Sequence, residues 1–197
     1  MESKSKNSAL LVMDMQAAVL KSIPDNSILV GNTTLAIEHA RRSLIPVIFV
    51  VVGFRKGAIE ISPNNKGFKA AREKFANIEG EEFMQIDQRI KPAASDIKVI
   101  KRRVSAFTGS DLEVVLRSCA IEHLILAGVA TGGVILSTLR EAADKDYLLT
   151  VLSDCCADLD SEVHQLLTTK IFPRQAEVIT TNEWRSESEP DIKSGRS

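Results

Sequence analysis

Short apolar runs alternate with longer amphipathic stretches along most of the chain. The apolar runs are rich in β-branched and aliphatic side chains and predict buried strands at residues 9–13, 46–52, 97–100, 123–127, 147–152 and 176–180. Stretches with apolar residues at helical spacing predict helices at residues 27–43, 110–120, 134–144 and 161–171. The second of these begins with Ser110 and Glu113, which have the spacing of a capping box. This alternation indicates a three-layer, doubly wound α/β fold with a six-stranded parallel sheet and helices on both faces.

One long segment departs from the alternation. Residues 53–90 are polar, with Pro63 and several glycines, and so long an excursion within a compact domain is usually functional. Residues 1–7 and 185–197 lack apolar anchors, which predicts a disordered N-terminus and a flexible tail. The pattern therefore predicts one domain at residues 8–184.

Composition narrows the class of protein. The 197 residues are 44% apolar and 26% charged, which is typical of a soluble domain that folds without disulfides or a structural metal. The net charge of −1 excludes a strongly basic nucleic-acid binder, and no apolar run approaches the length of a membrane span, so we expect neither nucleic acid nor membrane as a partner. Three cysteines without framework spacing (Cys119, Cys155 and Cys156) predict reduced thiols and a cytoplasmic protein.

Candidate chemistry gathers where predicted strands end. In an open α/β sheet, ligands bind beyond the carboxyl ends of the strands, and Asp14, Lys101 and the glycine-rich turn of residues 128–133 all follow such ends. An aspartate held ionised by a nearby ammonium, beside a turn that opens a helix, would form an acid/base and anion-stabilising site. The alternative is that Asp14 only caps the following turn and that Lys101 is a solvated strand end.

Three sequence blocks carry a resemblance to a known family. They are Leu10–Gln16 (LLVMDMQ), Ile100–Phe107 (IKRRVSAF) with Gly109–Leu112 (GSDL), and Leu126–Thr131 (LAGVAT) with Ser137, Thr138 and Ala142. In this order and spacing they resemble the isochorismatase-like (cysteine hydrolase) superfamily over residues 8–181. The resemblance implies a six-stranded parallel sheet and a cytosolic enzyme that acts on a small molecule, needs no cofactor and forms a homo-oligomer (dimer or tetramer).

The resemblance also implies roles for single residues. Asp14 matches the catalytic aspartate of the family and Lys101 its catalytic lysine. The peptide between Val129 and Ala130 falls where members commonly have a cis bond. The candidate substrate-binding residues are Gln16, Arg55, Phe107, Val129, Ala130, Thr131, Gly132, Gly133 and Val134, and the backbone amides of residues 131–134 are expected to stabilise a developing negative charge.

One position departs from the family pattern. The amidases of the superfamily carry a nucleophilic cysteine where this chain has Val134, which excludes a covalent cysteine mechanism through that position and counts against nicotinamidase-type or carbamoylsarcosine-type hydrolysis. We expect structural roles for the three cysteines, with Cys119 on the apolar side of its helix and Cys155 and Cys156 after the fifth strand. True isochorismatases have a small residue at this position and are thought to use the aspartate as a general acid, with water capturing the resulting cation. They carry a histidine where Gly132 stands, however, so isochorismate itself is a doubtful substrate.

A metal site is not expected. Metal-dependent relatives place an Asp-x-His pair after the second strand, where this chain has no histidine, and His39, His123 and His164 lie elsewhere in the sequence. We interpret His164 as a partly exposed or core histidine.

Two hypotheses of function follow from these residues. In the first, the protein is a hydrolase of a small polar metabolite that uses Asp14 and Lys101 without a cysteine nucleophile. In the second, it is a catalytically degenerate relative that binds a small molecule or a protein. The retained Asp14, Gln16 and Lys101 favour the first hypothesis, and Val134 favours the second.

Overall fold

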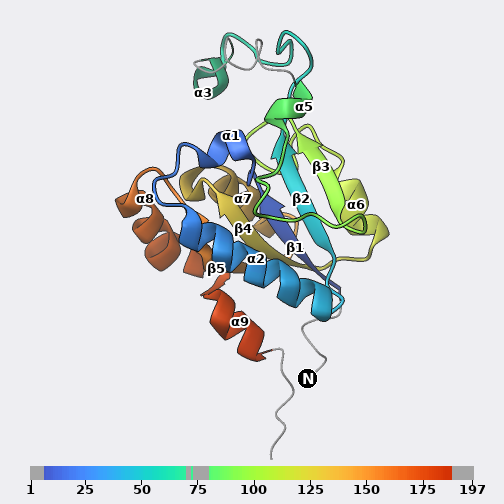
Figure 1. The fold of residues 1–197 in the computed structure, drawn as a ribbon, viewed down its shortest axis with the longest axis vertical. Coiled ribbons are helices and arrows are strands. Elements are labelled where there is room, and N and C mark those ends of the chain that lie inside the picture. Colours follow the sequence, from blue (N-terminus) through green and yellow to red (C-terminus); the bar gives the residue numbers. More distant parts are fainter. Residues whose placement is uncertain (1–6, 70–71, 73–79, 188–197) are drawn as a thin grey trace, which may run out of the picture.

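The computed structural model describes residues 7–69, 72 and 80–187. Its centre is a parallel sheet in the order β3-β2-β1-β4-β5-β6, as Figure 1 shows. The strands are β1 (Ser8–Met13), β2 (Val47–Val52), β3 (Ile97–Lys101), β4 (His123–Val129), β5 (Leu148–Ala157) and β6 (Glu177–Ile179). Every residue of β1 and β2 is buried, because these strands lie inside a sheet that is covered on both faces. The predicted fold class, with six parallel strands, is confirmed.

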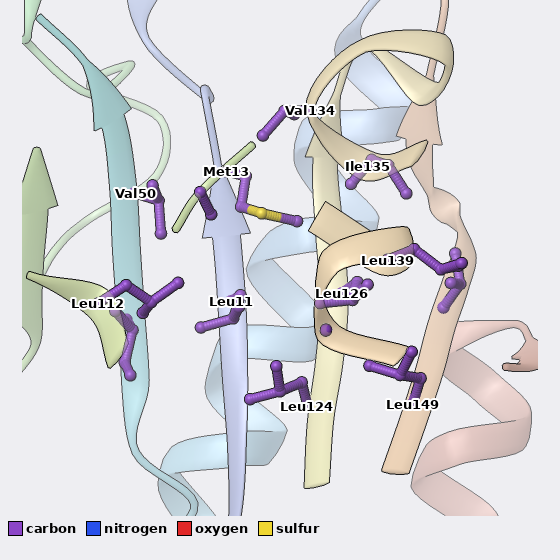
Figure 2. Packing of buried hydrophobic residues seen from close by; sticks show 14 of the residues in the cluster. Leu11, Met13, Val50, Leu112, Leu124, Leu126, Val134, Ile135, Leu139 and Leu149 are labelled. Atoms are coloured by element: carbon purple, nitrogen blue, oxygen red, sulfur yellow. The ribbon is translucent and has the colours of Figure 1, made fainter. Parts of the chain in front are cut away.

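Helices cover both faces of the sheet. One face packs against α2 (Ser27–Arg42) and α9 (Thr181–Glu187), and the other against α6 (Leu112–Ser118) and α7 (Leu136–Ala143) (Figure 1). The remaining helical segments are α1 (Ala17–Leu20), α3 (Lys66–Lys69), α5 (Gly80–Phe83), α8 (Ser161–Leu166), two π-helical turns at Thr131–Ile135 and Leu167–Ile171, and a 3₁₀ turn at Phe172–Arg174. Each face of the sheet has its own apolar cluster. Figure 2 shows the cluster on the face covered by α6 and α7, where Ile135 and Leu139 pack toward Met13 and Leu126.

The predicted end of the fifth strand is wrong. Strand β5 continues to Ala157 instead of ending at residue 152, because its pairing with β4 resumes at Cys156 and Ala157 after a register shift at the polar residues Ser153 and Asp154. Cys155 and Cys156 therefore lie within this strand rather than after it.

The predicted capping box is not formed, because Asp111 and not Ser110 is the N-cap of α6, and it makes no side-chain cap hydrogen bond. Ser110 Oγ accepts a hydrogen bond from the backbone N–H of Leu112 at 3.2 Å, but Glu113 turns away to pair with Lys145 and Arg117. Helix α6 consequently begins two residues later than the pattern indicates.

The excursion after β2 covers the carboxyl ends of the strands. Its described part contains α3 and α5 (Figure 1), and its own Phe54, Ile61 and Phe83 belong to a small apolar cluster that also packs against Val19. An isolated antiparallel bridge between Gln16 and Ile86 ties the returning chain to the segment that follows β1. The excursion thus forms a roof over the edge of the sheet where ligands bind in such folds.

The chain ends differ in part from expectation. The carbonyl of Asn7, the last residue of the segment predicted to be disordered, accepts hydrogen bonds from the backbone of Glu122 and His123. Helix α9 buries Trp184 and continues to Glu187, past the predicted domain boundary at residue 184. Residues 1–6 and 188–197 lie outside the described part. Within that part, no helix is both long and apolar enough to span a membrane.

Candidate active site

Asp14 takes its position from the end of the central strand. Its backbone N–H makes a 2.8 Å hydrogen bond to the carbonyl of Val50, and its backbone then enters the left-handed region (φ 54°), which aspartate tolerates better than most residues. The chain leaves the sheet at this point, and the residue is only 7% exposed. A carboxyl group is thereby held below the surface at the carboxyl edge of β1.

Lys101 reaches Asp14 from two strands away. It ends β3, which is separated from β1 by β2, and its Nζ lies 2.9 Å from Asp14 Oδ2. The same ammonium donates to the carbonyls of Arg103 at 2.9 Å and Val104 at 3.1 Å. Three acceptors match the three protons of a lysine ammonium. Lys101 is 2% exposed, so the alternative of a solvated strand end is wrong.

The two oxygens of Asp14 have different surroundings. Oδ2 bonds Lys101, whereas Oδ1 is buried without a hydrogen-bond partner among the described residues. Burial raises the pKa of Asp14 above its ordinary value, and the charge and hydrogen bond of Lys101, together with a backbone hydrogen bond from Val52, offset this only in part. A carboxyl that retains its proton more readily, with one oxygen free, is suited to act as a general acid.

The glycine-rich turn follows β4, directly beside β1. Gly128 has φ 140°, and a Cβ on it would lie 2.0 Å from the carbonyl oxygen of Met13, so only glycine allows the two strands to approach this closely. The peptide between Val129 and Ala130 is cis, as the family resemblance implied.

The turn amides are partly engaged within the protein. The N–H of Gly132 donates to Asp158 Oδ2 at 2.6 Å, and the N–H of Gly133 donates to the carbonyl of Ala130 at 3.0 Å. Two of the four amides expected to stabilise a developing negative charge therefore already have acceptors. Thr131, the first residue of the helical turn, is fully buried and shares a 2.8 Å hydrogen bond between its Oγ1 and His164 Nδ1.

Val134 belongs to the apolar core. It is 2% exposed and lies near Met13 and Ile135 at the upper edge of the cluster in Figure 2. The side chain at this position thus packs in the cluster that includes Met13, the last residue of β1. Valine offers packing there and no nucleophilic atom.

The three cysteines are either buried or at a helix end. Burial raises the pKa of Cys155 to about 12 and raises that of Cys156 further, so both thiols stay protonated at neutral pH. Cys155 lies 3.0 Å from Thr181 Oγ1, within the core of the other face. Cys119 is exposed at the end of α6, which corrects its predicted place on the apolar side of the helix.

The side-chain amide of Gln16 cross-links three segments of the chain by hydrogen bonds. Its Nε2 donates to the carbonyls of Val52 at 3.1 Å and Phe83 at 2.6 Å, its Oε1 accepts from the N–H of Val52 at 2.8 Å, and the residue is fully buried. These bonds join the end of β2 and the roof to the segment beside Asp14. Direct contact of Gln16 with a substrate stays a prediction, one that its existing hydrogen bonds do not favour.

Two other candidates, Arg55 and Phe107, are engaged with neighbouring side chains. The Arg55 side chain is 66% exposed and pairs with Glu60 at 2.8 Å. Phe107 is 7% exposed and packs in the core beside Tyr147, with Lys145 Nζ 5.5 Å from its ring centre. Their predicted substrate contacts remain predictions.

Sequence reasoning missed Asp158, and it interpreted His164 as an ordinary partly exposed or core residue. Asp158 directly follows β5, so it stands at a carboxyl strand end just as Asp14 does, but the strand was predicted to end at residue 152. Had the strand been extended to Ala157, the same rule that singled out Asp14 would have singled out Asp158. Within the described ranges, no three histidine, cysteine or acidic side chains are grouped as metal ligands.

Comparison with known proteins links this arrangement to one family. The model of the isochorismatase domain matches residues 8–183. A ureidoacrylate amidohydrolase of Pseudomonas savastanoi pv. phaseolicola is 31% identical over 175 residues, which cover 77% of this chain and 71% of that protein. A probable inactive nicotinamidase of Arabidopsis thaliana is 26% identical over 194 residues and covers 95% of this chain and 99% of its own length.

A solved structure supports the fold. The chain superposes on a cysteine hydrolase from Pseudomonas syringae pv. phaseolicola with a TM-score of 0.84, covering 95% of this chain and 94% of the other. At 20% sequence identity, this likeness concerns the fold alone.

Proposed function

The chain belongs to the isochorismatase domain family, and from this membership we propose that it hydrolyses a small polar metabolite by an Asp14/Lys101 mechanism that uses no cysteine nucleophile. One observation carries the proposal: a buried carboxyl with a raised pKa has Oδ2 fixed by Lys101 and Oδ1 without a partner among the described residues. The small-molecule substrate and the homo-oligomeric state are part of the same proposal.

The mechanism follows from the two oxygens of Asp14. Lys101 holds Oδ2, so Oδ1 is the oxygen that carries the transferable proton. Asp14 donates this proton to the substrate, water adds to the carbon that becomes electron-poor, and the proton lost by water returns to Asp14. In the resulting tetrahedral adduct the bond from this carbon to the leaving nitrogen or oxygen then breaks, the leaving group departs with the proton from Asp14, and a hydroxyl proton of the adduct returns to Asp14 as the carbonyl forms. Lys101 stabilises the carboxylate that exists between successive transfers. Val134 forms no covalent bond in this sequence of steps.

Likeness to a ureidoacrylate amidohydrolase supports amides and ureides as the first substrates to test. Small vinyl ethers, including isochorismate, complete the panel, because direct protonation by Asp14 also suits a vinyl ether.

The test is turnover of this panel followed by mass spectrometry. We expect wild-type turnover of at least one compound and a fall of about 10²- to 10⁴-fold in Asp14→Asn, the range that general acid catalysis contributes. Cys119→Ser, which removes the one exposed thiol of the three cysteines, should leave turnover unchanged. Turnover that persists in Asp14→Asn would contradict the mechanism.

A second candidate function is that of a binding module without turnover. The observation that favours it is Val134, a core side chain where the family amidases carry their nucleophile. Likeness to a probable inactive nicotinamidase is consistent with this alternative. If the wild-type protein turns over none of the compounds in the panel, the result would favour the binding module.

A further inference from the structure

The ammonium of Lys101 is held by backbone as well as by Asp14. Its Nζ donates to the carbonyls of Arg103 at 2.9 Å and Val104 at 3.1 Å, and it lies 2.9 Å from Asp14 Oδ2. A lysine side chain is flexible and its ammonium is a compact charge with rotatable donors, so the acceptors around it determine where it lies. Whatever fixes the backbone of residues 102–104 therefore also fixes the cation beside Asp14.

Residues 102–104 lie outside any helix or strand and are half-buried or exposed. The chain that follows them is anchored to α7, where Ser105 Oγ donates to Glu141 Oε2 at 2.6 Å and the N–H of Ala106 donates to Thr138 Oγ1 at 2.9 Å. This anchor comes after the two carbonyls that bind Lys101. The backbone of residues 102–104 therefore depends on contacts made by its own side chains.

These contacts lead to Glu60, in the excursion after β2. Oε1 of Glu60 pairs with Arg102 Nε at 3.4 Å, and the backbone carbonyl of Glu60 accepts from Arg103 Nη2 at 2.9 Å. Arg103 Nη1 also donates to the carbonyl of Arg102 at 2.7 Å, which ties the two arginines to each other. One residue of the excursion thus binds both arginines of the segment that holds the Lys101 ammonium.

Glu60 is itself held in place. Its side chain is 13% exposed, and its carboxylate accepts from Arg55 Nη1 at 2.8 Å and from the backbone N–H of Arg55 at 3.2 and 3.3 Å. Ala58 and Ile61, on either side of it in the chain, are buried in the apolar cluster of the excursion. Burial acts to raise the pKa of Glu60, but hydrogen bonds from backbone N–H groups and the Arg55 side chain outweigh it and lower the pKa. Glu60 is therefore a carboxylate at neutral pH.

We propose that Glu60 is a positioning residue that keeps the Lys101 ammonium at Oδ2 of Asp14. It acts through the backbone of residues 102–104, by binding Arg102 and Arg103. The inference goes beyond the proposed hydrolase function and rests on it for the role of Asp14 as an acid. A fixed ammonium stabilises the carboxylate that Asp14 becomes when it gives up its proton, whereas an ammonium that moves away stabilises it less.

Two effects of Glu60 on the pKa of Asp14 have opposite signs. As a negative charge, Glu60 disfavours a second carboxylate, so the loss of its charge alone would lower the pKa of Asp14. As an anchor, Glu60 keeps a cation beside Asp14, so the loss of the anchor would raise that pKa. The sign of the change therefore distinguishes positioning of Lys101 from a direct effect of charge.

The experiment titrates the Asp14 carboxyl by ¹³C NMR in the wild-type protein, Glu60→Ala and Glu60→Gln. We expect the pKa of Asp14 to rise by about 0.5–1 unit in Glu60→Ala, a part of the effect that an adjacent cation has on a carboxyl. The rise should be smaller in Glu60→Gln, because the amide oxygen can still accept from the N–H of Arg55. Exchange of the Lys101 ammonium protons with water, followed by ¹⁵N NMR, should accelerate at least about threefold in Glu60→Ala.

Glu81→Ala is the matched control, since it removes an exposed carboxylate from α5 of the same excursion and should change neither measurement. An unchanged or lower pKa of Asp14 in Glu60→Ala would overturn the proposal, and so would an equal rise in Glu81→Ala. Neither measurement needs turnover. A substrate panel without turnover would overturn the hydrolase function instead, so the two failures are distinguishable.

Discussion

The two sides of the candidate site handle charge in opposite ways. On one side, Asp14 and Lys101 form a buried pair that leaves a single carboxyl oxygen without a partner. On the other, the exposed Gly132 amide is closed by the carboxylate of Asp158. The first side buries a carboxyl oxygen without a partner beside a fixed cation, whereas the second satisfies its donor with a carboxylate from the same chain.

The difference separates a buried carboxyl from an exposed backbone amide. A proton donor gains from a raised pKa and from an oxygen without a partner, and burial beside a fixed cation combines the two at Asp14. The buried side should therefore dominate stability.

The largest effect is expected from Lys101→Met. The substitution leaves Asp14 buried without its cation and should lower the free energy of unfolding by about 3–5 kcal/mol at neutral pH, as is typical when one partner of a buried ion pair is removed. Urea unfolding measures this loss. Lys98→Met, on the exposed face of the same strand, is the matched control and should change stability little.

The pH dependence of that loss gives a sharper test. A carboxyl whose pKa is raised in the folded state stabilises the fold below its unfolded pKa, near 3.8, and loses this contribution as the pH rises through the folded pKa. Removal of Lys101 raises the pKa of Asp14 further, so the deficit of Lys101→Met should be smaller at pH 5 than at pH 8. A deficit that is equal at both pH values would contradict the role of Lys101 as the counter-charge of Asp14.

A smaller loss is expected from Gln16→Leu. The substitution removes three hydrogen bonds and leaves the buried N–H of Val52 without its acceptor, which should cost about 2 kcal/mol. Hydrogen exchange at the Val52 amide should accelerate in parallel. Gln85→Leu removes an exposed amide from the same roof and serves as the control. A loss below about 0.5 kcal/mol for Gln16→Leu would show that these hydrogen bonds contribute little to the free energy of unfolding.

The smallest effect belongs to the exposed side. In Gly132→Ala, the new methyl group forces Asp158 and Val163 to shift by a few tenths of an ångström, and we expect a loss of about 1 kcal/mol together with a weaker Gly132–Asp158 hydrogen bond. Gly31→Ala, in an exposed part of α2 with nothing within 4 Å, should instead gain about 0.5–1 kcal/mol from better helix propensity. Thermal unfolding of the two variants distinguishes crowding at the turn from the general effect of replacing a glycine.

Much of the fold is readable from the sequence because its strands are short and apolar throughout. The runs in β1 and β2 are buried on both faces, and no other element type accommodates them so simply. The end of β5 escaped prediction because Ser153 and Asp154 look like a turn, although the neighbouring strand sustains the pairing beyond them. At these residues, pairing with β4 determines the end of the strand more than the polarity of the local sequence does.

The sequence identifies candidate site residues but not the contacts between them. Asp14 and Lys101 were identified by their places after strands and by the family resemblance, yet their 2.9 Å contact depends on the order of the strands and on a side chain that crosses β2. The raised pKa of Asp14 depends on how deeply the pair is buried, which no spacing reveals. The bond between Asp158 and Gly132 joins residues 26 positions apart and has no local signal in the sequence.

Titration of the Asp14 carboxyl by ¹³C NMR tests the central claim most directly, because it needs no substrate and reports on the group proposed as the acid. The account predicts a pKa above the ordinary value of 3.8 in the wild-type protein, raised by burial despite the charge of Lys101. A pKa at or below 3.8 would mean that Lys101 keeps Asp14 as a permanent carboxylate, and it would contradict proton donation by Asp14 as the chemistry of this site.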